Sequence, residues 1–342
     1  MPSIPFTNAL KPAAGLFKRL TTIAPKEAKL TVGLDIGASS VKVLALGPRK
    51  GGGARPIVGQ HLVPLAPDGD ASDAIKAAMG ALPVPVRSVN LSVSGQWVIM
   101  RIVEMPTMKP AETKQALPFE AQRYLPFNIQ DVIIDGVVLG PADAHKQWVL
   151  IVACKKELIE RRIDGVKRVG LEPALIDVDA LALANGFLAG VNGASGEKTR
   201  ALINVGAQLT NLVIFKGDTP YLVRDVPCGG EKLVRAAAEQ MGQDAASVSD
   251  ALKGATLSPE LQSALKAACE MLVTELQLSF DYFENRFGHP PEETLVSGGF
   301  SQCAGFLEAL KSHLAQAVTP WAPAQGLSGQ FAVAYGLALR TD

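Results

Sequence analysis

Short apolar runs bounded by glycine, proline and polar residues follow one another from residue 30 onward and predict β-strands. Longer stretches with apolar residues three or four positions apart alternate with them and predict helices. We expect strands at 30–35, 41–46, 57–65, 88–93, 96–104, 132–139, 148–154, 174–177, 200–204, 209–215, 221–226 and 294–297. We expect helices at 72–82, 110–124, 156–169, 179–188, 260–286, 305–313 and 331–339. This mixed order predicts an α/β protein.

The first 29 residues depart from this pattern, because they carry five basic residues against a single acid, Glu27, with apolar residues interspersed. Two readings are open: a segment that lies on a membrane surface, since basic amphipathic stretches are attracted to anionic lipid, or a tail. The chain contains no run of about 20 apolar residues and no signal-peptide pattern. We therefore expect a cytoplasmic protein without a transmembrane segment.

The charge balance narrows the function classes. The chain has 342 residues, 33 Lys and Arg against 33 Asp and Glu, and a formal net charge of +0. This balance does not favour a nucleic-acid partner, which usually meets a basic face, and the length predicts at least two lobes. The four cysteines and four histidines are scattered without CxxC pairs, which is typical of buried thiols in a reducing compartment rather than of zinc sites or disulfides.

One pattern occurs twice and carries the candidate chemistry. Residues 33–44 (GLDIGASSVKVL) align with residues 202–213 (LINVGAQLTNLV). Each copy is an apolar strand, then Asp or Asn, an aliphatic residue, Gly-Ala, small or polar residues, and a second strand. The pattern is neither a P-loop nor a Rossmann turn. A duplicated strand–turn–strand unit in one chain predicts two related lobes.

Such a turn suits an anion. Glycine lets the backbone approach a phosphate closely, and successive turn N–H groups form a concave cradle. Ser39, Ser40 and Thr210 offer hydroxyl donors, Lys42 offers a positive charge, and Asp35 is placed to hold Mg²⁺ through its waters. Asp179 is a second candidate for the metal. The candidate nucleotide-binding residues are Asp35, Gly37, Ala38, Ser39, Ser40, Lys42, Asn204, Gly206, Ala207, Gln208, Thr210, Gly229, Gly230, Gly298 and Gly299.

These residues resemble a known superfamily, that of actin, sugar kinases and heat-shock chaperones. Residues 32–42 are similar to its first phosphate motif, 204–210 to its second, and 295–299 to its adenosine motif; 177–183 and 332–339 are similar to its two connecting helices. The resemblance implies a two-lobed actin-like (ribonuclease-H-like duplicated) α/β fold that binds ATP or ADP with Mg²⁺ between the lobes.

Within that superfamily, residues 116–127, 131–135 and 275–283 resemble the PilM family of type IV pilus assembly proteins. The resemblance implies a small subdomain inserted in the first lobe. We therefore expect a basic tail at 1–29, a first-lobe core at 30–87 with 177–199 and 330–342, an inserted subdomain at 88–176, a second-lobe core at 200–228 with 293–329, and a helical subdomain at 229–292.

The same resemblance implies an ATP-binding cytoplasmic adaptor, peripheral at the inner membrane through its partners. Its expected partner is the cytoplasmic N-terminal peptide of a PilN-like membrane protein; pilus motor ATPases and self-association are further candidates. We expect the strands at about 96–104 and 148–154, together with the adjoining first-lobe surface, to frame a groove for this peptide. Taken singly, Pro118-Phe119 and Pro126-Phe127 are expected to pack the core of the insertion.

The second phosphate motif departs from the family pattern, because Asn204 stands where Asp is usual and Gln208 where Thr or Ser is common. Asn keeps hydrogen-bonding ability but lacks the charge that organises magnesium and an attacking water. We therefore expect nucleotide binding with weak or no ATPase activity.

Two alternatives stay open. A sugar or acid kinase needs a general base, for which Asp177 and Asp179 are candidates, although carboxylates also favour a helix start. A filament-forming, membrane-associated protein of the FtsA kind usually carries a C-terminal amphipathic helix, and the sequence ends directly after the last expected helix. A secretion protein of the GspL kind continues into a membrane span that this sequence does not contain.

Overall fold

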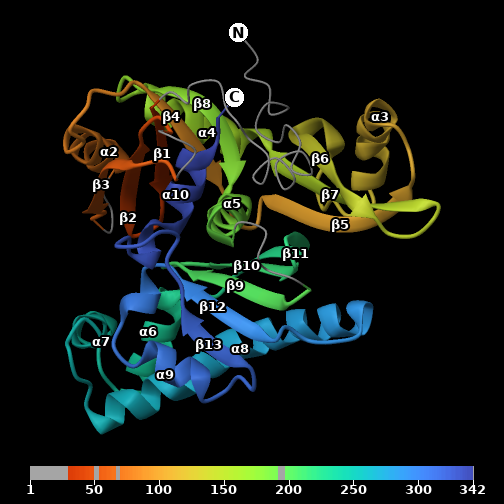
Figure 1. Ribbon diagram of the computed structural model, residues 1–342. Coiled ribbons are helices and arrows are strands. Elements are labelled where there is room, and N and C mark those ends of the chain that lie inside the picture. The colour runs from red at the N-terminus through yellow and green to blue at the C-terminus, as the bar shows by residue number, and fades with distance from the viewer. Residues whose placement is uncertain (1–29, 50–53, 67–69, 192–196, 342) are drawn as a thin grey trace. The chain divides into compact units, whose positions relative to one another are not determined.

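The computed structural model describes residues 30–49, 54–66, 70–191 and 197–341 (Figure 1). The basic segment at 1–29 lies outside these residues. The chain divides into two compact units, Met1–Ala194 with Val333–Asp342, and Ser195–Ala332. None of the helices in the described part is long and apolar enough to cross a membrane.

The first unit is built on a five-stranded sheet with the strand order β3-β2-β1-β4-β8. Its strands are β1 (Thr31–Ile36), β2 (Ser40–Leu46), β3 (Ile57–Pro64), β4 (Ser88–Val93) and β8 (Glu172–Val178). The first three strands run antiparallel, whereas β1, β4 and β8 run parallel. Strands β1, β2 and β4 are buried along most of their length, as expected for a sheet covered on both faces.

The second unit repeats this sheet with the order β11-β10-β9-β12-β13. Its strands are β9 (Thr199–Val205), β10 (Thr210–Lys216), β11 (Thr219–Val226), β12 (Glu293–Ser297) and β13 (Ala317–Pro320). The strand directions also repeat: β9, β10 and β11 are antiparallel, and β9, β12 and β13 are parallel. The duplicated sequence pattern therefore corresponds to a duplicated topology, in which β1–β2 matches β9–β10.

A separate three-stranded sheet lies within the first unit, with the order β5-β7-β6. Its strands are β5 (Val98–Pro106), β6 (Val132–Pro141) and β7 (Lys146–Lys155). Helix α3 (Pro110–Ala121) packs on β6 and β7 through Leu117 and Ala121. The expected insertion at 88–176 is too wide at both ends, because β4 and β8 are strands of the five-stranded sheet.

The remaining helices of the first unit are α2 (Ala71–Gly80), α4 (Lys156–Lys167), α5 (Asp179–Val191) and α10 (Ala332–Leu339), which begins at the boundary between the units. Glycines allow α10 to approach its neighbours closely. A side chain at Gly33 would lie 2.0 Å from the Ala334 carbonyl oxygen, and one at Gly336 would lie 1.7 Å from that of Ala182. Helix α10 therefore contacts β1 and α5 backbone to backbone.

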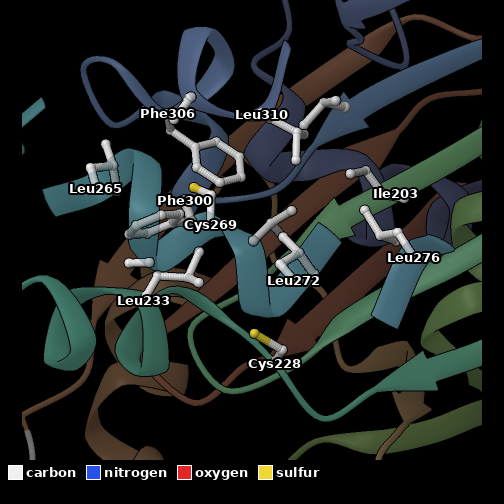
Figure 2. Close-up of a cluster of buried hydrophobic side chains, with 14 of the residues drawn as sticks. Ile203, Cys228, Leu233, Leu265, Cys269, Leu272, Leu276, Phe300, Phe306 and Leu310 are labelled. Carbon is white, nitrogen blue, oxygen red and sulfur yellow. The ribbon is translucent and has the colours of Figure 1, made fainter. Parts of the chain in front are cut away.

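The second unit is rich in helix: α6 (Gly230–Met241), α7 (Ala245–Ala251), α8 (Pro259–Phe287) and α9 (Phe306–Lys311). Helix α8 begins where Ser258 accepts a hydrogen bond from the Leu261 N–H, and it ends at Gly288, whose φ of 87° suits glycine. Its apolar face meets α6 and α9 in the core of the unit (Figure 2). Cys228 and Cys269 are buried there, and burial raises the pKa of the Cys269 thiol to about 12, as expected of structural thiols.

Candidate functional site

The first candidate turn joins β1 to β2 and carries a charged pair. The Gly37 N–H donates to the Ser40 carbonyl at 3.1 Å and closes the turn. Asp35 and Lys42 are directly opposite each other in the β1–β2 register, and the Lys42 ammonium lies 3.0 Å from Asp35 Oδ2. Their side chains are only 10% and 12% exposed. The cation proposed for phosphate and the acid proposed for magnesium therefore neutralise each other here.

Glycine at position 37 keeps a side chain away from this charged pair. A Cβ at that position would lie 3.6 Å from Lys42 Nζ and 4.0 Å from Asp35 Oδ1. Ala38 and Ser39, at the tip, are exposed, and Ser40 is buried. Backbone, cation and carboxylate therefore meet at this turn, and a side chain at position 37 would lie in contact with all three.

Asp179, at the start of α5, lies beside this turn. Its carboxylate accepts hydrogen bonds from Ser92 and Ser94, and Asp35 and Arg162 are its charged neighbours. Burial, and next the negative charge of Asp35, raise the pKa of Asp179, against the opposing effects of the two serines and Arg162. Arg162 also donates to the Ile36 carbonyl at 3.0 Å and so braces the turn. The first unit therefore brings two carboxylates and two cations together.

The second candidate turn joins β9 to β10 with the same backbone closure, since the Gly206 N–H donates to the Leu209 carbonyl at 3.0 Å. It is braced differently. The carbonyls of Gly206 and Ala207 accept from the N–H groups of Gly230 and Glu231 at 2.9 and 2.8 Å. The second turn is therefore held by backbone N–H groups at the start of α6, whereas the first turn is held by the side chain of Arg162.

Three predicted contacts of the second turn have structural partners instead. The Thr210 hydroxyl donates to the Cys228 carbonyl at 2.7 Å, and Thr210 is 0% exposed, so this hydroxyl is not directed at a ligand. A Cβ at Gly229 would lie 2.5 Å from the Ala207 carbonyl oxygen, and one at Gly230 would lie 2.2 Å from the Phe300 ring. Close packing explains both glycines. Gln208, by contrast, is exposed at the tip of the turn.

A ladder of polar side chains crosses the second sheet next to this turn. Asn204 is opposite Asn211 in the β9–β10 register, and Asn211 is opposite Asp225 in the β10–β11 register. The Asn204 amide donates to Asn211 Oδ1 at 2.9 Å, and the Asn211 amide donates to Asp225 Oδ1 at 2.8 Å. On the other side, the Ser297 hydroxyl donates to the Ile203 carbonyl at 3.0 Å and lies 3.5 Å from Asn204 Oδ1.

The adenosine-motif glycines lie at the same end of the second sheet. Gly298 follows β12 with a φ of 100°, and a Cβ there would lie 2.4 Å from the Val205 carbonyl oxygen. Only glycine fits this position, because both the backbone angle and the close approach exclude a side chain. Gly299, in contrast, has open space around its Cα. Val205 is flanked by Asn204 and Gly206, so the second and third motifs are adjacent.

Asp177 is not available as a general base. It is 1% exposed and forms an ion pair with Arg340, whose Nη1 lies 3.0 Å from Asp177 Oδ2. Burial raises the pKa of Asp177 more than the charge of Arg340 lowers it. The Asn90 amide donates to the Leu337 and Arg340 carbonyls at 2.8 and 3.0 Å. These contacts tie β4 and β8 to the end of α10.

One expectation for the inserted sheet is wrong and one stays a prediction. Strands β5 and β7 are paired from Val98 opposite Cys154 to Pro106 opposite Lys146, so a peptide does not lie between them, and the groove that they are expected to frame with the adjoining first-lobe surface stays a prediction. The edge strands of this sheet are β5 and β6. Phe119 is 78% exposed and does not pack the core of the insertion. Phe127 is half-buried, with the Lys155 ammonium 4.6 Å from its ring centroid.

Sequence reasoning missed the groups that surround the predicted residues, namely Ser92, Ser94, Arg162, Asn211, Asp225 and Ser297. The sequence contained one signal for Asn211, because the repeat aligns it with Lys42. In the structure Lys42 is opposite Asp35, and Asn211 is opposite Asn204. Ser92, Ser94 and Arg162 belong to segments far from the first turn in the sequence, whereas Asp225 lies 14 residues after Asn211 and Ser297 lies within the motif at 295–299. Within the described ranges, no group of three or more His, Cys, Asp and Glu side chains is arranged to hold a metal ion.

Solved structures that resemble this chain include the following three. A chain of the PilM–PilN type IV pilus biogenesis complex superimposes with a TM-score of 0.80 at 24% identity, over 92% of this chain and 98% of that chain. The ethanolamine utilization protein EutJ from Carboxydothermus hydrogenoformans gives a TM-score of 0.56 at 13% identity, over 98% and 97%. A diol dehydratase-reactivating factor in nucleotide-free form gives 0.55 at 9% identity, over 91% and 99%.

At these identities the solved structures establish the fold alone, which is the duplicated α/β fold of actin-like ATPases. The family is established by sequence. The family described as type IV pilus assembly protein PilM matches residues 33–342, which includes both five-stranded sheets except the first residues of β1. This chain therefore belongs to the PilM family of type IV pilus assembly proteins.

Proposed function

We propose that this chain is a nucleotide-binding adaptor of the type IV pilus assembly platform, held at the inner membrane by a PilN-like partner. The observation that carries the nucleotide part is the pair of turns at Gly37 and Gly206. They have the same backbone closure, occupy equivalent places in two sheets of the same order, and each is flanked by a polar pair in register. Family membership supports the pilus part.

Each turn is proposed to contribute to the binding of ATP or ADP phosphates. Turn N–H groups and the Lys42 ammonium suit phosphate oxygens, and the Asp35 carboxylate suits the water shell of Mg²⁺. The Lys42–Asp35 ion pair fits this use. A bound phosphate would give Lys42 a new negative partner in place of Asp35, and a divalent cation would give Asp35 a new positive partner in place of Lys42. Of the other sites, Ala38, Ser39, Ala207, Gln208, Gly298 and Gly299 stay proposed contacts, as does Asp179 for the metal.

Hydrolysis is proposed to be weak or absent. Asn204 places a neutral amide where a charged carboxylate would polarise water, and Asp177 is neutralised by Arg340. Phosphate release by the purified chain, compared with that by the Asn204→Asp variant, measures this directly. Rapid release by the native chain would contradict the proposal.

For the partner, we propose that the cytoplasmic N-terminal peptide of a PilN-like protein adds to an edge strand of the inserted sheet. The support is twofold: the matched structure is a PilM–PilN complex, and this sheet has two edge strands, β5 and β6, whose outer backbone groups suit an extended peptide. Motor ATPases and self-association stay predictions.

Nucleotide binding is tested by thermal unfolding with and without Mg-ADP. A ligand at about 100 times its Kd adds about 2.7 kcal/mol to the free energy of unfolding, so the native chain should melt at a higher temperature. Asp35→Ala and Gly206→Ala should each reduce this shift. Asp73→Ala, which removes a largely exposed carboxylate on α2, is the matched control and should keep it. An equal shift in all four proteins would eliminate the assignment.

The partner proposal is tested by calorimetry with the synthetic peptide and a scrambled version, followed by hydrogen exchange. Binding of the native peptide should slow exchange in the β5 or β6 backbone. Absence of binding would contradict the adaptor role, whereas binding with protection confined to residues outside 98–155 would move the site elsewhere.

A further inference from the structure

The ladder Asn204–Asn211–Asp225 has a fixed direction. An ionised carboxylate can only accept hydrogen bonds, so Asp225 requires the amide NH₂ of Asn211 to face it. The observed bond from Asn211 Nδ2 to Asp225 Oδ1 has this geometry at 2.8 Å. Asn211 is almost completely buried, so its amide has few other ways to be satisfied.

The orientation of the Asn211 amide in turn limits how Asn204, on the next strand, can bond to it. With its NH₂ turned to Asp225, Asn211 has only its carbonyl oxygen to offer to Asn204. Asn204 must therefore donate its own NH₂, which it does at 2.9 Å. Its oxygen, Oδ1, is then left for other donors, and the Ser297 hydroxyl lies 3.5 Å from it. The two hydrogen bonds therefore run in one direction, from β9 through β10 to the acid on β11.

We propose that Asp225 is a positioning residue of the second turn: acting through Asn211, it fixes the amide of Asn204 so that the carbonyl oxygen, and not the NH₂ group, is presented beside Gly206. The same logic explains why an acid at position 204 is incompatible with this ladder. Two carboxylates on either side of Asn211 would both need its single NH₂ group, and one of them would face the Asn211 oxygen.

The consequence for ligands rests on the proposed nucleotide binding. A carbonyl oxygen accepts hydrogen bonds, so position 204 suits donors such as the waters around a divalent cation, and it does not suit a bare phosphate oxygen. Asn204 then offers the same kind of atom as an Asp would, without the charge. Asp225 acts through Asn211 and is not itself a contact in this proposal.

The test is a reversal of the ladder by isosteric exchange. Asn204→Asp alone should weaken the folded state, by on the order of tenfold in the unfolding equilibrium constant, because a buried acceptor loses its donor. Adding Asp225→Asn should restore most of this loss, since Asn211 can then turn its NH₂ to position 204 and its oxygen to position 225. Additive effects of the two substitutions, measured by urea unfolding without ligand, would overturn the proposal.

Repulsion between two acids would also produce such a rescue, and the Asn211→Leu background separates the two causes. Positions 204 and 225 are two strand spacings apart, about 9 to 10 Å. The non-additive part of the effects at positions 204 and 225 on the free energy of unfolding is their coupling. It should largely disappear when Asn211 is replaced, because no side chain then connects the two positions by hydrogen bonds. Coupling that persists undiminished would assign it to direct repulsion and overturn the relay.

The second readout is nucleotide affinity, measured with Mg-ADP and with ADP in chelator. Asp225→Asn leaves the Asn211 and Asn204 amides free to turn, so it should weaken Mg-ADP binding about threefold to tenfold and leave metal-free ADP binding nearly unchanged. Equal weakening of both would contradict the assigned orientation. A native chain that binds no ADP would refute the proposed function. The urea unfolding of the substituted proteins, which needs no ligand, would still decide whether Asp225 acts on Asn204 through Asn211.

Discussion

The two turns are closed by the same backbone hydrogen bond but carry different side chains: a charged pair in the first unit and a neutral pair in the second. In the first unit, Asp35 and Lys42 face each other as an ion pair, and the next strand continues with apolar Leu62 in register. In the second unit, Asn204 and Asn211 face each other as neutral amides, and the acid appears one strand further away, at Asp225. The comparison teaches that both duplicated turns keep polar side chains next to the turn, although the charged residues lie on different strands in the two units.

The difference extends beyond the turns. The first unit buries the ion pair Asp177–Arg340 and, in the inserted sheet, Asp135, whose Oδ2 has no hydrogen-bond partner. The second unit has no comparably buried ion pair among its described residues, and its polar ladder ends on a partly exposed acid. The stability of the first unit should therefore depend on charge and pH more than that of the second.

The largest expected effect comes from removing one member of the buried ion pair. Arg340→Met leaves Asp177 as an uncompensated buried carboxylate, so the free energy of unfolding of the first unit should fall by about 3 to 5 kcal/mol. Hydrogen exchange, read separately for peptides of each unit, measures the loss. Lys76→Met, which breaks a largely exposed pair with Asp73, is the control and should cost less than about 1 kcal/mol. Equal losses would contradict the contrast.

The backbone brace of the second turn is the next test. Gly229→Ala would place a methyl group 2.5 Å from the Ala207 carbonyl oxygen, and this overpacking should cost about 1 to 3 kcal/mol in urea unfolding. Gly165→Ala, in α4, meets nothing within 4 Å and should instead stabilise the chain slightly. A Gly229→Ala protein as stable as the native one would show that the turn does not depend on this close approach.

The buried carboxylate of Asp135, whose Oδ2 has no hydrogen-bond partner, predicts a pH dependence of stability. Burial is the main cause that raises the pKa of Asp135. As the pH rises, the unfolded chain releases this proton first, so the contribution of Asp135 to stability is present below its unfolded pKa and is lost as the pH passes its folded pKa. Asp135→Asn removes the charge and keeps an oxygen for the Gly136 N–H.

The variant should therefore raise the free energy of unfolding by about 1 kcal/mol at pH 8, and by less at pH 4. Urea unfolding at both values measures the difference. A gain that is independent of pH would place its cause elsewhere.

The smallest effect is expected from making the first turn neutral. The double variant Asp35→Asn, Lys42→Asn copies the amide pair of the second turn, and should change the ligand-free unfolding free energy by less than about 1 kcal/mol, because a buried ion pair replaced as a whole costs little. Lys42→Met alone should cost more, since it leaves Asp35 beside Asp179 without its cation. The reverse order in thermal unfolding would contradict this account of the pair.

Local patterns predicted most of the elements. The expected helix at 260–286 is α8 (Pro259–Phe287), and the expected strands at 88–93 and 132–139 are β4 and β6. Strand β13 (Ala317–Pro320) was missed, because it is short, contains proline and exists only by pairing with β12. Family and fold were also correctly predicted, because they rest on the resemblance of short motifs, such as 32–42 and 116–127, whose residues are neighbours in the sequence.

The sequence by itself determined the two turns, their glycines and the exchange of Asp for Asn at position 204. Only the tertiary structure decided what those residues touch: that Thr210 is turned to Cys228, that Asp177 is paired with Arg340, and that Asn204 donates to Asn211. The physical reason is that hydrogen bonds and ion pairs depend on distances and registers between different strands and helices, which the packed structure sets. A periodic pattern specifies which face a side chain occupies, but not which partner it meets there.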